Sequence, residues 1–205
     1  QLNFKSENTI CDDICNISSD DIPDHDVLVG GFPCQSFSTV NPTKDPFDDR
    51  ANLYKQMLRI VNEKRPKIFI AENVKGLMTL YVGKIFKKIV SEFEACGYRI
   101  YNALLNAADY GVPQKRERVI VVGVRDDIIK EYEFPAKIEG DRVPLSAVIP
   151  QLAISDKKYY FSERAVLGMK NAKNNMKRGL AQNLNEPCLT ITSHLAKTSL
   201  NSRDP

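Results

Sequence analysis

The sequence predicts an α/β fold in which helices cover a sheet of mostly parallel strands. Short apolar runs of strand length alternate with longer segments whose apolar residues recur at helical spacing. Glycine or proline closes most of these segments, and unusual polar residues come directly after the predicted strands. Because chemistry in such sheets gathers just beyond the carboxyl ends of the strands, we expect the functional residues there.

The first predicted pair of elements is a strand and a helix. Residues 26–31 form a short apolar run that ends at two glycines, which predicts a buried strand. Residues 52–64 place Leu53, Met57, Leu58 and Val61 on one helical face. This helix should end near Arg65, because Pro66 disfavours the helical conformation in the residue before it.

The pattern then repeats. Residues 68–71 predict a second buried strand, and residues 83–96 predict a helix with Gly97 at its C-cap. Residues 98–105 and 119–124 predict two further strands. The chain thus supplies four strands and two helices for one sheet domain, which we place at residues 1–140.

The remainder, residues 141–205, predicts a smaller appended region. It has short apolar runs, several prolines and one helix from Ser162, a good N-cap, to about residue 172. Seven basic residues lie within 157–178, opposed only by Glu163. Such a face either neutralises phosphates or is a solvated helix face, and composition leaves both interpretations open.

Composition favours a cytoplasmic protein that is not bound to a membrane. The formal net charge is +3, and no apolar run approaches the roughly 18 residues that a membrane span needs. We see no signal peptide. The five cysteines are odd in number and irregularly spaced, which indicates a reducing compartment and no disulfide framework. We expect no metal, because a structural zinc site needs four clustered ligands.

Three groups of residues carry candidate chemistry. Cys34 lies in a tight turn after the first strand, Glu72 follows the second strand, and Gln114 to Arg118 directly precede the last. A thiolate beside a carboxyl group suits a nucleophile with its acid, and the basic residues suit an electron-rich ring or a phosphate. Taken singly, each is as readily a packing cysteine, a strand-end cap or a salt-bridged surface.

The order of these residues resembles the C5-cytosine-specific DNA methyltransferase family. The resemblance rests on Gly-Phe-Pro-Cys-Gln-Ser-Phe-Ser at 31–38, Glu-Asn-Val at 72–74 and Gln-Lys-Arg-Glu-Arg at 114–118, with supporting similarity at 49–54 and 106–113. It implies a Rossmann-like S-adenosylmethionine-dependent methyltransferase sheet, here partial. Residues 1–140 would be part of the catalytic domain, and 141–205 the start of a target-recognition region.

The resemblance also implies a reaction and its residues. Cys34 would add to C6 of a flipped-out cytosine, Glu72 would protonate or hydrogen-bond N3, and Arg118 would hold O2 with support from Arg116. A methyl group from S-adenosylmethionine would then pass to C5. We expect Glu72 to be buried for its role.

The resemblance assigns binding residues by position. Asp13, Ile14, Pro33 and Leu53 would contact the cofactor. For double-stranded DNA, the candidates are Gln35, Ser38, Thr39, Lys44, Arg50, Thr190 and Ile191. Thr190 and Ile191 would read base edges, although a buried strand explains them equally well. A bacterial restriction-modification system is the expected setting.

The sequence departs from the family at both ends. It has no Phe-x-Gly-x-Gly-Gly run for the cofactor and no Arg-x-x-Thr-x-Arg-Glu segment. We therefore interpret it as an internal piece, with a missing segment or partner chain that completes the sheet at an exposed edge. The alternatives are a catalytically silent DNA-binding fragment and one part of a split methyltransferase. RNA methylation is less favoured because the Cys-Phe-Thr tripeptide is absent, and a cysteine hydrolase lacks a partner pattern.

Overall fold

The computed structural model describes residues 9–32, 53–149, 162–170 and 183–190. The chain divides into two compact units. The first unit contains residues 1–104 and 118–134, and the second contains residues 105–117 and 135–205. The division into a catalytic region up to residue 140 and a recognition region from 141 stays a prediction.

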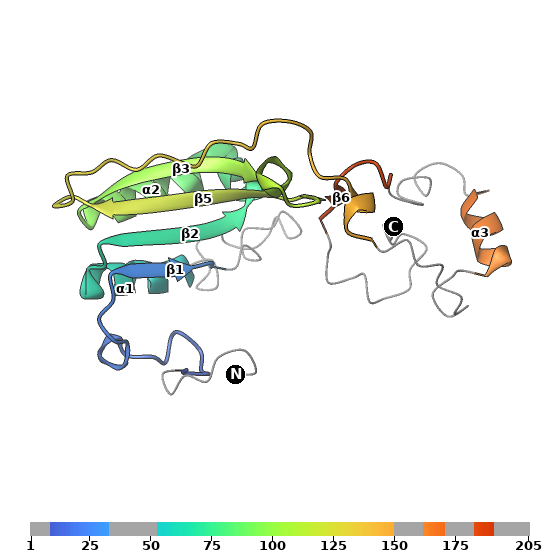
Figure 1. Ribbon diagram of the computed structural model, residues 1–205. Helices are drawn as coiled ribbons and strands as arrows, with labels where there is room; N and C mark the ends of the chain where they lie inside the picture. Colours follow the sequence, from blue (N-terminus) through green and yellow to red (C-terminus); the bar gives the residue numbers. More distant parts are fainter. Residues whose placement is uncertain (1–8, 33–52, 150–161, 171–182, 191–205) are drawn as a thin grey trace. The chain divides into compact units, whose positions relative to one another are not determined.

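The main sheet has four strands in the order β1-β2-β5-β3 (Figure 1). These strands are β1 Val27–Gly30, β2 Ile68–Val74, β5 Glu117–Arg125 and β3 Tyr98–Asn106. Strand β1 pairs with β2 in parallel, whereas β2 pairs with β5 antiparallel over seven residue pairs, from Ile68↔Val124 to Val74↔Arg118.

The sheet is therefore mixed: β1, β2 and β3 run in one direction, as expected of a mostly parallel sheet, and β5 is reversed. Only residues 107–116 separate β3 from β5, and a parallel connection needs a crossover of about a dozen residues or more. The Asp126 amide donates to the Gly97 carbonyl oxygen at 3.1 Å, just past the end of β5 and before the start of β3. Strand β5 thus runs back between β2 and β3, opposite to both.

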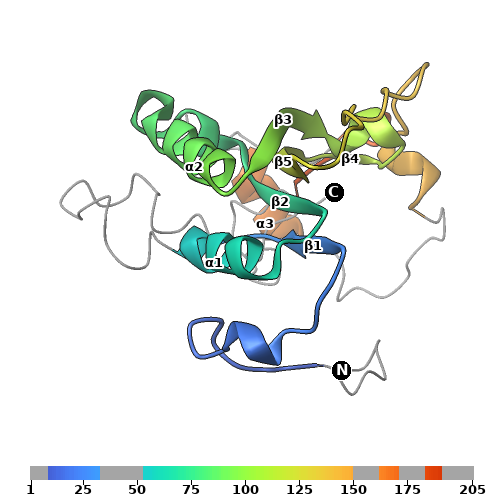
Figure 2. The same cartoon turned by 90° about the vertical axis from the view of Figure 1, so that its left-hand side faces the viewer.

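Both long helices lie on the same face of this sheet (Figure 2). They are α1 Tyr54–Lys64 and α2 Lys84–Ala95, close to the predicted ranges. Helix α1 ends where Pro66 predicted, because Arg65 adopts a left-handed conformation (φ 52°) and its amide caps Val61. Short 3-10 turns η4 Lys75–Met78 and η5 Leu80–Gly83 connect β2 to α2, and η1 Ser19–Asp21 precedes β1.

The core lies between the helices and the central strands. It contains Tyr54, Met57, Val61, Phe69, Ala71, Leu77, Phe86, Ile89, Phe93, Tyr98, Val119 and Val121. Phe69 is fully buried, and its ring centroid lies 4.5 Å from that of Phe93. Burial, followed by a hydrogen bond to Glu92, raises the pKa of the Tyr54 hydroxyl well above its ordinary value.

The prediction that the first strand is buried is wrong. Strand β1 is an edge of the four-stranded sheet, and Val27 and Val29 are 51% and 70% exposed. Leu28, which alternates with them, packs against the core. An apolar run bounded by glycines does not distinguish a central strand from an edge strand, and this is why the pattern misled.

The second unit holds a small two-stranded sheet. In it, β4 Gln114–Lys115 pairs in parallel with β6 Cys188–Leu189. The 3-10 turns η6 Ala107–Tyr110 and η7 Leu145–Ala147 belong to the same unit. Helix α3 Glu163–Lys170 starts after Ser162 as predicted, and it is described to residue 170.

Asp109 organises the start of the second unit. Its carboxylate is held by Lys137 (Nζ to Oδ2, 2.9 Å) and by Arg142 (Nε to Oδ1, 2.8 Å). Hydrogen bonds from these two cations hold the pKa of Asp109 below its ordinary value. Within the described ranges of the chain, no helix is long and apolar enough to cross a membrane, and no group of three His, Cys, Asp or Glu side chains is placed to hold a metal ion.

Candidate active site

Glu72 lies inside β2 and not after it, because β2 continues to Val74. Side chains alternate along this strand, so Phe69, Ala71 and Asn73 are buried while Glu72 points to the opposite face. Its side chain is 44% exposed, so the expectation of a buried Glu72 is wrong. The carboxyl group therefore projects from the sheet face away from the helices.

Arg118 is the ion-pair partner of Glu72. Its Nε lies 2.7 Å from Oε1 of Glu72. Glu72 is opposite Ile120 in the ladder, and Arg118 is opposite Val74, so the two side chains are diagonal neighbours on one face. Arg118 belongs to β5, whereas the sequence placed it just before a strand. The antiparallel return of β5 brings these two motifs together.

Two residues of the matched motifs that were given no role, Asn73 and Gly31, lie where the chain leads to Pro33. Nδ2 of buried Asn73 donates to the Phe32 carbonyl oxygen at 2.9 Å. A Cβ at Gly31 would lie 3.6 Å from Oε2 of Glu72, so the Gly31 backbone passes close to that carboxyl group. The Asn in Glu-Asn-Val was the available signal, since a buried amide needs a partner.

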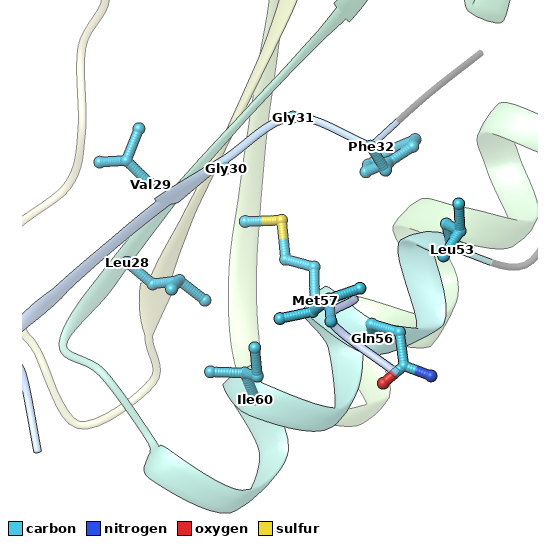
Figure 3. A pocket seen from close by; sticks show the side chains of 10 residues that line it. Leu28, Val29, Gly30, Gly31, Phe32, Leu53, Gln56, Met57 and Ile60 are labelled. Atoms are coloured by element: carbon cyan, nitrogen blue, oxygen red, sulfur yellow. The ribbon is translucent and has the colours of Figure 1, made fainter. Parts of the chain in front are cut away.

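A pocket of about 310 Å³ lies on the helix side of β1 (Figure 3). It is lined by Ile14, Leu28, Val29, Gly30, Gly31, Phe32, Leu53, Gln56, Met57 and Ile60. Met57 extends from α1 toward Gly30, while Leu28 and Val29 point to opposite sides of β1 (Figure 3). The predicted cofactor residues Ile14 and Leu53 thus meet at one cavity, although they lie far apart in the sequence.

Asp13, the remaining predicted cofactor residue among the described ones, comes directly before the pocket-lining residue Ile14. It is not among the residues that line the pocket, and its Oδ1 accepts a hydrogen bond from the Cys15 amide at 2.9 Å. That bond lowers the pKa of the Asp13 carboxyl group. The side chain closes a local turn, whose next residue, Ile14, reaches the pocket.

Arg116 and Thr190 belong to the second unit. The Arg116 carbonyl oxygen accepts from the Ala107 amide at 3.0 Å, which fixes its backbone at the end of β4. The Thr190 hydroxyl donates to the Lys115 carbonyl oxygen at 2.9 Å. Lys115 also pairs with Glu186 and thereby lowers the pKa of that carboxyl group. The arginine motif is therefore held by a segment some 70 residues later in the chain.

Comparison with known proteins identifies the family. The C-5 cytosine-specific DNA methylase family matches residues 1–199. The chain belongs to this family. It is 43% identical over 155 residues to the type II methyltransferase M.BspRI of Lysinibacillus sphaericus, which covers 73% of this chain and 36% of that protein. It is also 48% identical over 125 residues to the type II methyltransferase M.NgoFVII of Neisseria gonorrhoeae. That match covers 60% of this chain and 33% of that protein.

Solved structures show the same fold. The Entamoeba histolytica methyltransferase EhMeth superimposes with a TM-score of 0.68 at 20% identity, covering 96% of this chain and 59% of that one. The Dnmt2 methyltransferase of S. pombe gives 0.64 at 17% identity, covering 90% and 57%. The predicted Rossmann-like α/β class is confirmed. The chain spans about a third of the length of the curated relatives named above.

Several family positions lie outside the described residues. They are the expected nucleophile Cys34, the cofactor residue Pro33 and the DNA-binding candidates Gln35, Ser38, Thr39, Lys44, Arg50 and Ile191. The structure describes the chain up to Phe32, two residues before Cys34. Membership of the family thus rests on the matched sequence. The structure describes two of the expected catalytic residues at their ion pair, Glu72 and Arg118, and the pocket beside β1.

Proposed function

We propose that the protein transfers a methyl group from S-adenosylmethionine to C5 of a cytosine in double-stranded DNA. The observation that carries this proposal is the Glu72–Arg118 pair, 2.7 Å apart, beside the backbone that leads into Pro33 and Cys34. The relatives are type II methyltransferases, which favours a restriction-modification setting for this protein as well.

The shape of the cytosine ring supports the roles of Glu72 and Arg118. N3 and the O2 carbonyl are adjacent on one edge of the ring, so a guanidinium N–H can donate to O2 while a carboxyl O–H donates to N3. The second bond requires the Glu72 carboxylate, which is paired with Arg118, to take a proton from solvent as the base binds. The ion pair holds the two side chains in this arrangement before a base arrives, which lowers the cost of orienting them. Arg116, at the end of β4, would support the site.

Cys34 would act as the nucleophile. Its thiolate forms a bond to C6, while N3 gains a proton or a hydrogen bond from Glu72, and C5 becomes electron-rich. C5 would take the methyl group as its bond to the donor sulfur breaks. C5 would then lose its proton to solvent, and the electrons of that C–H bond restore the C5–C6 double bond and expel the Cys34 thiolate, while N3 returns its proton to Glu72. Since C5 and C6 are inaccessible in stacked DNA, the base must leave the duplex.

The pocket beside β1 fits the adenosyl part of the methyl donor. Its volume of about 310 Å³ is within the range of small-molecule sites, which begins at about 300 Å³. Ile14, Leu53 and Met57 offer apolar walls to a flat ring, and Gln56 adds a polar group. Pro33 and Asp13 remain candidate contacts. The donor supplies an electrophilic methyl group; the protein binds and orients it.

The exposed edge of the sheet is a candidate pairing site for another strand. Val27 and Val29 of edge strand β1 are exposed, and an unpaired strand edge is a template for another strand. We propose that a further segment or a partner chain pairs there in the active enzyme. The predicted DNA contacts at Gln35, Ser38, Thr39, Lys44, Arg50, Thr190 and Ile191 complete the proposed complex.

The test is methyl transfer from radiolabelled S-adenosylmethionine to DNA by the full-length gene product. Glu72→Gln should lower kcat by about 100-fold, the usual contribution of a positioned acid. Glu94→Gln, at an exposed position on α2, serves as the control and should retain wild-type activity. A wild-type protein that binds DNA without methylating it would instead identify a silent DNA-binding protein.

A further inference from the structure

Arg59, on the second turn of α1, makes four side-chain hydrogen bonds although it does not line the pocket. Its Nη1 donates to Ser19 Oγ at 2.5 Å, and its Nη2 donates to the carbonyl oxygens of Ile17 at 2.9 Å and Ile14 at 3.4 Å. Its Nε donates to Oε1 of Gln56 at 2.9 Å. One guanidinium therefore joins α1 to three points of the segment 14–19.

This segment is the one that carries Ile14 to the pocket. Its neighbouring bonds are local: the Asn16 amide donates to the Asp13 carbonyl oxygen at 2.8 Å, and the Cys15 amide to the Asp13 side chain. Local turns set the shape of a segment but not its place against a helix. The Arg59 bonds span 40 to 45 residues of sequence, so they fix that place.

Arg59 also orients a second wall of the pocket. Gln56 lines the cavity from α1, three residues before Arg59, and its oxygen is held by Nε. The amide group is thereby turned so that its oxygen faces Arg59. A planar guanidinium with five donors in a fixed fork can hold these partners at once, which a lysine cannot do.

We propose that Arg59 is a positioning residue for the methyl donor, acting through Ile14 and Gln56 without lining the pocket itself. This inference rests on the proposed function, because it takes the cavity to be the donor site. Loss of Arg59 should reduce the fraction of molecules whose 14–19 segment is in the binding arrangement. Apparent affinity falls by that same fraction.

The experiment is calorimetric titration of S-adenosylmethionine into the full-length protein, with Arg59→Met compared with Arg125→Met. Arg125 is a matched control: its side chain is 23% exposed against 27% for Arg59, and it bonds Asp127 and the Arg65 carbonyl oxygen, neither of which belongs to a residue that lines the pocket. We expect Arg59→Met to raise the donor Kd about tenfold, as a tenfold fall in the competent fraction implies, and Arg125→Met to leave it unchanged.

Kinetics and amide exchange separate positioning from general loss of stability. For Arg59→Met, the KM for the donor should rise about tenfold, while the KM for DNA and kcat at saturating donor stay near wild type. The amides of Cys15 and Asn16 should exchange faster, with no change in β3. Should Arg59→Met fail to fold, Ser19→Ala removes one of the same bonds and should raise the donor Kd about threefold, a smaller loss of the same kind.

The outcomes are distinct. Equal donor affinity in wild type, Arg59→Met and Ser19→Ala would overturn the role of Arg59 while leaving the proposed methyl transfer in place. Equal weakening by Arg59→Met and Arg125→Met would also overturn it, because any loss of stability would then suffice. A wild-type protein that binds no S-adenosylmethionine would overturn both this inference and the proposed function.

Discussion

The two neighbours of β2 differ in almost every physical respect. On one side, β5 pairs with β2 over seven residues, and Val119, Val121, Val122 and Val124 are buried. On the other side, β1 pairs over only four residues and leaves Val27 and Val29 exposed at the sheet edge. The central strand thus has one rigid, buried partner and one exposed partner.

The ion pair and the pocket lie on different sides of β2. The Glu72–Arg118 pair is built across the long β2–β5 ladder, where an ion pair is held at 2.7 Å. The pocket lies beside β1, where Met57 and Leu53 of the α1 region supply flexible walls. We infer that the β5 side sets the geometry for catalysis, while the β1 side forms the ligand pocket, whose Ile14 and Gln56 walls are held by Arg59.

The largest predicted contrast is in stability. Phe69→Ala removes a fully buried ring that stacks on Phe93, so the free energy of unfolding should fall by about 4 kcal/mol. Val29→Ala, on exposed β1, should change it by less than about 0.5 kcal/mol. Urea denaturation of both variants measures the difference. Similar losses would mean that β1 is as buried as β2.

The next prediction compares a glycine in β5 with a glycine in β1. A Cβ at Gly123 of β5 would lie 2.0 Å from Cε1 of Phe69, so Gly123→Ala should cost about 3 kcal/mol of unfolding free energy. A Cβ at Gly30 of β1 would meet the flexible Met57 side chain, with Sδ at 3.5 Å and Cε at 3.8 Å, so Gly30→Ala should cost less than about 1 kcal/mol. Thermal or urea unfolding checks both, and a costlier Gly30→Ala would reverse the comparison.

A smaller effect is expected where β2 holds the chain that follows β1. Asn73→Ala removes a buried amide and leaves the Phe32 carbonyl oxygen without that donor, which should cost about 2 kcal/mol. Asn102→Ala, at an exposed position of β3, is the control and should be neutral. Methyl transfer should fall as well, since Phe32 leads to Cys34. Retention of full stability would show that Asn73 does not fix this turn.

Local sequence features predicted the elements well because their causes are local. Pro66 ended α1 and Gly97 followed α2, as the backbone preferences of these residues require. The pairing of strands is not local. The return of β5 between β2 and β3, which brings Arg118 to Glu72, depends on a ladder between distant residues.

Some site residues could likewise be predicted from the sequence, and others could not. The motif order indicated Glu72 and Arg118, and similarity to a family placed Ile14 and Leu53 near the cofactor. Asn73 entered only as a member of Glu-Asn-Val, without a role, and Arg59 did not enter at all, since both act through hydrogen bonds to backbone carbonyl groups 40 or more residues away. A carbonyl acceptor leaves no trace in side-chain chemistry, so these contacts required the structure.

The smallest expected effect concerns pH. Hydrogen bonds lower the pKa of Asp127 after β5, through Arg125, and of Asp13 before β1, through the Cys15 amide. A depressed carboxyl pKa adds stability above the ordinary value of 3.8 and loses it as pH falls through the folded value. Carboxyl NMR titration should give midpoints below 3.8 for both groups, and Arg125→Met should return only Asp127 to its ordinary range. A rise of the Asp13 pKa to its ordinary value in that variant would show that the regions around β5 and β1 are coupled, contrary to this account.

The most direct test of the central claim is covalent trapping on DNA that contains 5-fluorocytosine. Fluorine at C5 cannot leave as a proton does, so the Cys34–C6 bond should persist after methyl transfer. With S-adenosylmethionine present, the full-length protein should form a denaturation-resistant complex that peptide mapping assigns to Cys34, and Cys34→Ser should form none. Stable trapping through another residue, or methyl transfer that survives Cys34→Ser, would contradict the account.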